Sequence, residues 1–140
     1  MIFTLPYWYE RFNLDCPALD EQHQRLYCLA ANLHNALQLG LDSSVQAYML
    51  DHLEQNAVAH FDFEENLMEQ HALPELSEHR SQHHQDLDEL AELRSLVENG
   101  CPGVDLAMAM GQLFVHWFEK HIADFDRLLA GAIRHLPTRN

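Results

Sequence analysis

Apolar residues recur along most of the chain at intervals of three and four positions, which is the spacing of an α-helix with one buried face. Prolines at 6, 17, 74, 102 and 137 leave three long stretches uninterrupted, and "LQLGLDSS" at 37–44 divides the first. Within it, Gly40 suits the end of one helix, and Asp42 or Ser43 the start of the next. The pattern therefore predicts four helices, at about 19–38, 43–70, 76–98 and 105–135.

Each predicted helix carries one apolar stripe, and every stripe contains histidine. The stripes are Leu19, His23, Leu26, Ala30, Leu33 and Leu37; Leu50, Leu53, Ala57, His60, Glu64 and Leu67; Leu76, His79, His83, Leu87, Leu90 and Val97; and Leu106, Met110, Leu113, Trp117, His121, Phe125 and Leu128. Helices joined by short turns bury such stripes against one another at a crossing angle of about 20°. We predict an all-α, up-down-up-down four-helix bundle over 19–135, between an aromatic-rich N-terminal arm at 1–18 and a C-terminal tail at 136–140.

Composition narrows the possible partners. The 140 residues suit one domain, and their formal charge of −14 disfavours nucleic acid and anionic membrane surfaces. No apolar run approaches the roughly 18 residues that span a bilayer, and the first residues lack a signal-peptide pattern. Three cysteines without a CxxC motif suit a reducing compartment. We therefore expect a cytoplasmic protein without membrane insertion, monomeric because no second apolar face is evident.

The stripes also carry candidate metal chemistry. Residues four apart share a helix face, so His60 lies beside Glu64, and His79 beside His83. A buried, unpaired carboxylate costs several kcal/mol, and a bound cation removes that cost while satisfying imidazole lone pairs. "HRSQH" alone is a weak signal in a chain with 11 histidines, but histidines on all four stripes are a stronger one. Five nitrogens and at least two carboxylates exceed what one metal takes, whereas two irons with bridging carboxylates would use them.

The segments "DEQHQRL", "HFDFEE", "HRSQH" and "HWFEKHIADFD" resemble the hemerythrin family, in particular its bacterial single-domain members, over about 19–130. The resemblance implies a bundle that holds two non-haem iron ions with a bridging oxo or hydroxo group and binds O2 reversibly. Carried over by motif, one iron would be bound by His79, His83 and His121, the other by His23 and His60, and both by the bridging carboxylates of Glu64 and Asp126. The iron with two histidines would offer the open position for O2.

The resemblance also places Leu26, Phe61, Phe118 and Ile122 around an O2 pocket, although ordinary core positions explain these residues equally well. One spacing conflicts with helix geometry. Asp126 lies five residues after His121, about 140° around an ideal α-helix, whereas Asp124 lies at about 60°. The family's spacing selects Asp126, and side-chain reach or a local helix irregularity would supply the difference.

Three classes of function follow. The leading one is a non-enzymatic O2 protein for storage, scavenging or delivery to an oxygen-consuming enzyme. The second is an oxygen or redox sensor acting through a partner protein, which the absence of a signalling domain or long linker within these residues disfavours. The third is a di-iron peroxidase or NO-handling enzyme, but no acid, base or tyrosine is evidently placed to cleave an O–O bond.

Other metal arrangements fit less well. Ferritin-like carboxylate enzymes use ExxH on two helices, and the sequence contains no ExxH. Seven ligands suit two octahedral iron ions better than they suit zinc. A bundle without metal would leave the carboxylate of Glu64 buried among imidazoles with no cation to compensate its charge. The remaining histidines lack a place in the family pattern and are expected at the surface or in satisfied core positions: His34, His52, His71, His84, His116 and His135.

Overall fold

The structure, a computed structural model, describes residues 14–134, except for the side chains of Glu119, Lys120, Ala123, Asp124, Phe125 and Arg134. The predicted aromatic arm, apart from its last residues, and the predicted tail lie outside this range. Within it the elements are α1 (Pro17–Gln38), α2 (Ser43–Gln70), α3 (Leu76–Glu98), α4 (Gly103–Val115), the π-helix η2 (His116–Asp126) and α5 (Arg127–Arg134). No strand occurs among the described residues, and the predicted all-α class is confirmed.

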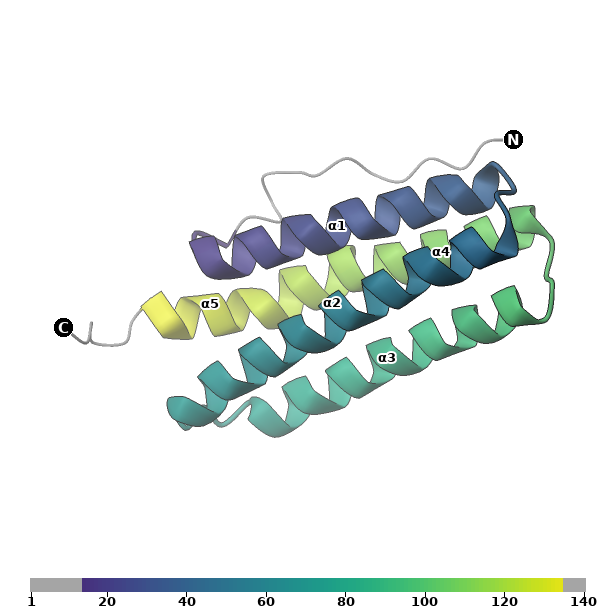
Figure 1. The fold of residues 1–140 in the computed structure, drawn as a ribbon. Helices are drawn as coiled ribbons and strands as arrows, with labels where there is room; N and C mark the ends of the chain where they lie inside the picture. Colours follow the sequence, from purple (N-terminus) through teal and green to yellow (C-terminus); the bar gives the residue numbers. More distant parts are fainter. Residues whose placement is uncertain (1–13, 135–140) are drawn as a thin grey trace.

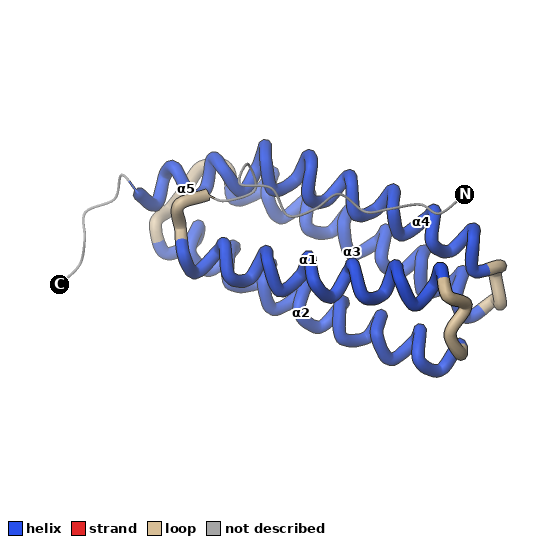
Figure 2. Tube along the Cα trace, turned by 90° about the horizontal axis from the view of Figure 1, so that it is seen from above, coloured by secondary structure: helices blue, strands red, loops and turns tan. Residues whose placement is uncertain are grey.

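The helices form an antiparallel bundle in which α1 packs beside α2 and α4, and α3 packs beside α2 and α4 (Figure 1). Short loops join them at the two ends (Figure 2), and η2 and α5 continue the path of α4. The up-down-up-down bundle predicted from the stripes is therefore confirmed. None of the described helices is long and apolar enough to cross a membrane.

Local sequence explains where α1 begins and ends. Pro17 occupies its first turn, where the missing N–H costs nothing, so the helix begins two residues before the predicted start. It ends at Gln38, and the chain then turns away at Gly40, whose φ of +64° is readily adopted only by glycine. There the Gly40 and Leu41 amides donate to the carbonyls of Leu37 (3.2 Å) and Ala36 (3.1 Å), which caps the last turn.

The buried interior consists of two apolar clusters with a polar layer between them. The larger cluster runs from Leu26 and Phe61 to Ile122, and the smaller one, near the start of α1, includes Leu19 and Met68. Along α1, His23 lies between members of the two clusters, and Glu64 does so along α2. The histidines and carboxylates on the stripes thus form one layer across the bundle, enclosed by apolar side chains on both sides.

The last predicted helix differs most from the structure. The pattern predicts one helix over 105–135, whereas the structure has an α-helix, a π-helix and a second α-helix in succession. Leu128, predicted to face inward, is 67% exposed, and Leu129 and Ala130 are buried instead. The cause is the wider winding of η2, which shifts the residues after it to a new register.

Candidate metal centre

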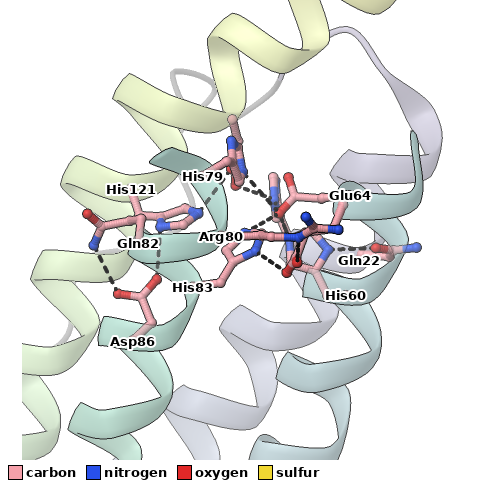
Figure 3. Close-up of polar contacts among 12 residues, drawn as sticks. Gln22, His60, Glu64, His79, Arg80, Gln82, His83, Asp86 and His121 are labelled. Atoms are coloured by element: carbon pink, nitrogen blue, oxygen red, sulfur yellow. Dashed lines mark hydrogen bonds and ion pairs between the residues drawn. The ribbon is translucent and has the colours of Figure 1, made fainter. Parts of the chain in front are cut away.

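All seven residues predicted as metal ligands lie in the polar layer, and none exposes more than 3% of its surface: His23, His60, Glu64, His79, His83, His121 and Asp126. They come from α1, α2, α3 and η2. Figure 3 shows His60, His79 and His83 close to Glu64, and His121 beside Asp86. The structure therefore brings together every residue of the predicted ligand set.

The seven side chains form two overlapping groups whose ligand atoms lie within 4.8 Å of one another. One group is Glu64, His79, His83, His121 and Asp126, and the other is His23, His60, Glu64 and Asp126. Both groups contain the same two carboxylates. Three histidines thus stand on one side of a carboxylate pair and two on the other.

Distances show how each carboxylate joins the groups. Asp126 Oδ1 lies 3.0 Å from His79 Nε2 and 3.1 Å from His121 Nε2, while its Oδ2 lies 3.0 Å from His23 Nε2. Glu64 Oε1 lies 3.1 Å from His60 Nε2 and 3.2 Å from His83 Nε2. Each carboxylate therefore contacts imidazoles of both groups, as a bridging ligand must.

The π-helix brings Asp126 to this layer. A π-helix closes its hydrogen bonds between residues five apart, so His121 and Asp126 lie on one side of η2. This local irregularity resolves the conflict between the five-residue spacing and α-helix geometry. The side chain of Asp124, the alternative that the α-helical angle favoured, lies outside the described residues.

Three of the histidines are held from behind by an oxygen acceptor. His60 Nδ1 lies 2.6 Å from Gln22 Oε1, His83 Nδ1 lies 2.8 Å from Glu65 Oε2, and His121 Nδ1 lies 2.8 Å from Asp86 Oδ2. Since these oxygens only accept, Nδ1 of His60 and Nδ1 of His83 carry the proton and donate it. The contact between His121 and Asp86 is an ion pair. In the neutral ring, Nε2 then presents a lone pair to the centre of the layer.

The polar layer fits a cation. Imidazole Nε2 atoms and carboxylate oxygens, all lone-pair carriers, stand 3.0 to 3.2 Å apart, and the Nε2 atoms of His23 and His60 are themselves 3.0 Å apart. The second oxygen of Glu64 is buried and has no hydrogen-bond partner among the described residues. Protons or metal ions must occupy such a layer, since buried lone pairs without a donor are costly.

The pKa values show the same demand for positive charge. Burial opposes the charged form of His79, but Asp126 and Glu64 raise its pKa to about 9. Burial also opposes the charged form of His121, but Asp126 and Asp86 raise its pKa well above the usual range. Burial would raise the pKa of both Glu64 and Asp126, but neighbouring imidazoles hold both below the usual range. Both carboxylates are thus ionised, as bridging ligands require.

The four residues predicted around the O2 pocket are buried members of the larger apolar cluster: Leu26, Phe61, Phe118 and Ile122. Phe61 stacks on His83 with ring centroids 4.0 Å apart, and Leu26 borders a cavity of about 90 Å³ beside His60. They enclose the polar layer on one side. The specific role of lining an O2 pocket stays a prediction.

Sequence reasoning missed the three acceptors behind the histidines. Gln22 directly precedes His23, and Glu65 directly follows Glu64. A position next to a ligand gives little indication that a residue orients an imidazole. Asp86 had a signal, because it continues the four-three spacing of His79 and His83. Counting only apolar residues put Leu87 on that stripe instead; the structure buries Asp86 and leaves Leu87 half-buried.

The remaining described histidines lie outside the layer, as expected. His34 is buried, and this burial lowers its pKa, while His52 and His84 are exposed. His71 and His116 are half-buried. His135 lies outside the described residues.

A helical bundle that gathers five imidazoles and two shared carboxylates in one buried layer has the fold and site of a non-haem metal-binding protein. Comparison with known protein families agrees with this. The hemerythrin family, described as the hemerythrin HHE cation-binding domain, matches residues 17–133 of this chain. The chain therefore belongs to the hemerythrin family, which implies that it binds non-haem iron, and the resemblance seen in the sequence is confirmed.

Similar proteins bear the name bacteriohemerythrin. One, from Stenotrophomonas maltophilia, is 25% identical over 127 residues, which cover 91% of this chain and 80% of the relative. Another, from Pseudomonas aeruginosa, is 27% identical over 128 residues, covering 91% of this chain and 81% of the relative. A protein from Pseudomonas paraeruginosa matches with the same identity and coverage.

Proposed function

We propose that this protein binds O2 reversibly at a centre of two iron ions. The observation that carries the proposal is the unequal distribution of histidines, three and two, around a shared pair of buried carboxylates. Such an arrangement suits two metal ions that are bridged but not equivalent. The family and the names of the similar proteins agree with this function.

In this proposal His79, His83 and His121 hold one iron, and His23 and His60 hold the other. Glu64 and Asp126, which belong to both groups, would be shared by the two ions, and an oxygen atom from solvent would join them. When bound, the iron pair supplies the electrons that make O2 binding favourable and reversible. The side with two histidines has fewer protein ligands and thus offers O2 an open position.

The chain's own residues orient the metal-binding imidazoles and exclude water from the buried layer. Gln22, Glu65 and Asp86 orient three imidazole rings through Nδ1 and leave Nε2 for the metal. Phe61 and Trp117, both almost completely buried, help to exclude water from the layer. Exclusion of water and reductants favours release of unchanged O2 over its reduction.

We therefore assign the protein as a carrier and not as an enzyme. Among the side chains that the structure describes, those named above as converging on the layer act as ligands or as acceptors behind them, which supports binding without O–O cleavage. The proposal also places the protein in the cytoplasm. Its support is that three cysteines are free, as is usual in a reducing compartment: Cys16, Cys28 and Cys101.

The test is an ultraviolet-visible spectrum of the reduced, iron-loaded protein before air, after air and after degassing. Reversible O2 binding predicts charge-transfer bands that appear with air and vanish on degassing. Direct conversion to a stable ferric spectrum would instead favour sensing or redox catalysis. Absence of any iron bands would contradict the di-iron assignment.

A further inference from the structure

A second group of metal-binding side chains lies outside the buried layer. Asp86 and Glu89, three residues apart on α3, face His116 at the start of η2. His116 Nδ1 lies 3.1 Å from both carboxylate oxygens of Glu89 and 3.9 Å from Asp86 Oδ1. None of these three residues belongs to the seven described above.

The three side chains fit a divalent ion better than they fit an ion pair. Asp86 is completely buried, and the imidazole beside its other oxygen, His121, is shared with Asp126. His116, even protonated, brings one positive charge to Asp86 and Glu89 together. Among the described residues, Asp86 Oδ1 accepts a long hydrogen bond, 3.4 Å, from Gln82 Nε2 (Figure 3). A dipositive ion would compensate the negative charge that remains.

The distances also suit a tetrahedral ion. Zinc binds nitrogen and oxygen at about 2.0 to 2.2 Å, so two ligands of a tetrahedral site stand roughly 3.3 to 3.6 Å apart. His116 Nδ1 lies 3.1 Å from Glu89 and 3.9 Å from Asp86, on either side of this range. Small side-chain rotations would therefore bring the ligand atoms to tetrahedral spacing. Imidazole with carboxylate favours zinc or a similar transition ion over Mg²⁺ or Ca²⁺, which prefer oxygen.

The cluster is accessible to an ion from solvent. Glu89 and His116 are about one-third exposed, at 30% and 28% of their side chains. Both line a cavity of about 310 Å³, whose lining also includes Glu92 and Gln112. Three protein ligands and an open side toward this cavity leave room for water as the fourth ligand.

We propose that Asp86, Glu89 and His116 form an outer binding site for one divalent transition-metal ion of the zinc type. The site is separate from the buried layer, but the two are connected through Asp86, whose other oxygen lies 2.8 Å from His121 Nδ1. The proposal does not depend on O2 binding, because it requires only these three side chains.

The experiment is a calorimetric titration of the iron-loaded protein with Zn²⁺, with iron absorption followed in parallel to verify that iron stays bound. Wild type is expected to take up one more equivalent of Zn²⁺ than His116→Ala. Glu89→Gln, a milder change that preserves size, is expected to weaken this equivalent by about tenfold or more. His84→Ala removes an exposed histidine of the same helix α3 and is expected to behave as wild type.

The proposal is overturned if wild type and His116→Ala bind Zn²⁺ with equal stoichiometry and affinity, or if His84→Ala loses the equivalent as well. Circular dichroism checks that each variant is folded. Because the comparison counts the difference between wild type and His116→Ala, it reports on the outer site even if the buried layer takes no iron. Failure of this site and failure of the proposed O2 centre are therefore distinguishable.

Discussion

At the scale of single residues, the groups behind the histidines differ between the two halves of the centre. On the side with three histidines, His83 donates to the carboxylate of Glu65, and His121 forms an ion pair with that of Asp86. His60, on the other side, contacts the neutral amide oxygen of Gln22. A carboxylate acceptor makes an imidazole a stronger electron donor, so we expect the three-histidine side to hold its metal more tightly.

The substitution Glu65→Gln tests this difference. It keeps the size of the side chain but removes the negative charge 2.8 Å from His83 Nδ1. We expect iron affinity to fall by about 10- to 100-fold while the protein stays helical, as measured by competition with a chelator. Glu69→Gln is the matched control, because Glu65 and Glu69 both contact Arg80, at 2.9 and 3.6 Å, but Glu69 is largely exposed. Equal iron retention by wild type and Glu65→Gln would contradict the positioning role.

The bridging carboxylate from η2 gives a second test. Asp126→Ala removes contacts to His23, His79 and His121 together, so we expect loss of iron and of its absorption spectrum. Asp124→Ala removes the same chemical group two residues earlier and is expected to retain both. Iron content and the visible spectrum of the two variants are the measurements. Damage in Asp124→Ala with a normal Asp126→Ala would show that the bridge is wrongly assigned.

At the scale of elements, regular helices were predictable and the π-helix was not. The predicted bounds of 43–70 and 76–98 match α2 and α3, because stripe spacing and prolines mark them directly. A π-helix has no comparable apolar pattern, and its only trace in the sequence is the five-residue step from His121 to Asp126. The stripe therefore fails at Leu128, beyond η2, while the ligand assignments, which rest on chemistry and family motifs, agree with the observed cluster.

The junction between α1 and α4 is tight enough to require glycine. A Cβ atom at Gly103 would lie 2.7 Å from the carbonyl oxygen of Leu37, a backbone atom that cannot easily move. We expect Gly103→Ala to lower the free energy of unfolding by about 1 to 3 kcal/mol, as overpacking does. Gly131→Ala, in α5 with nothing within 4 Å, is the control and is expected to raise it by about 0.5 to 1 kcal/mol. Urea unfolding measures both, and equal effects would contradict the close contact.

At the scale of the whole molecule, the bundle carries a buried layer of charged and polar groups between two apolar clusters. The apolar clusters favour folding, whereas the layer opposes it unless its lone pairs are satisfied. A cation that binds only the folded chain converts this cost into stability. The stability of the fold and the occupancy of the centre should therefore change together.

Removal of iron tests this coupling. Iron at about 100 times its dissociation constant adds roughly 2.7 kcal/mol, so we expect chelation to lower Tm by about 10 °C. His121→Ala removes one imidazole from the three-histidine group and should leave a helical, iron-poor protein in which chelation changes Tm little. His84→Ala, which removes an exposed histidine of α3, should keep the full shift. Differential scanning calorimetry with and without chelator separates these cases, because a shift of wild-type size in His121→Ala would mean that iron stabilises the bundle from somewhere other than this layer.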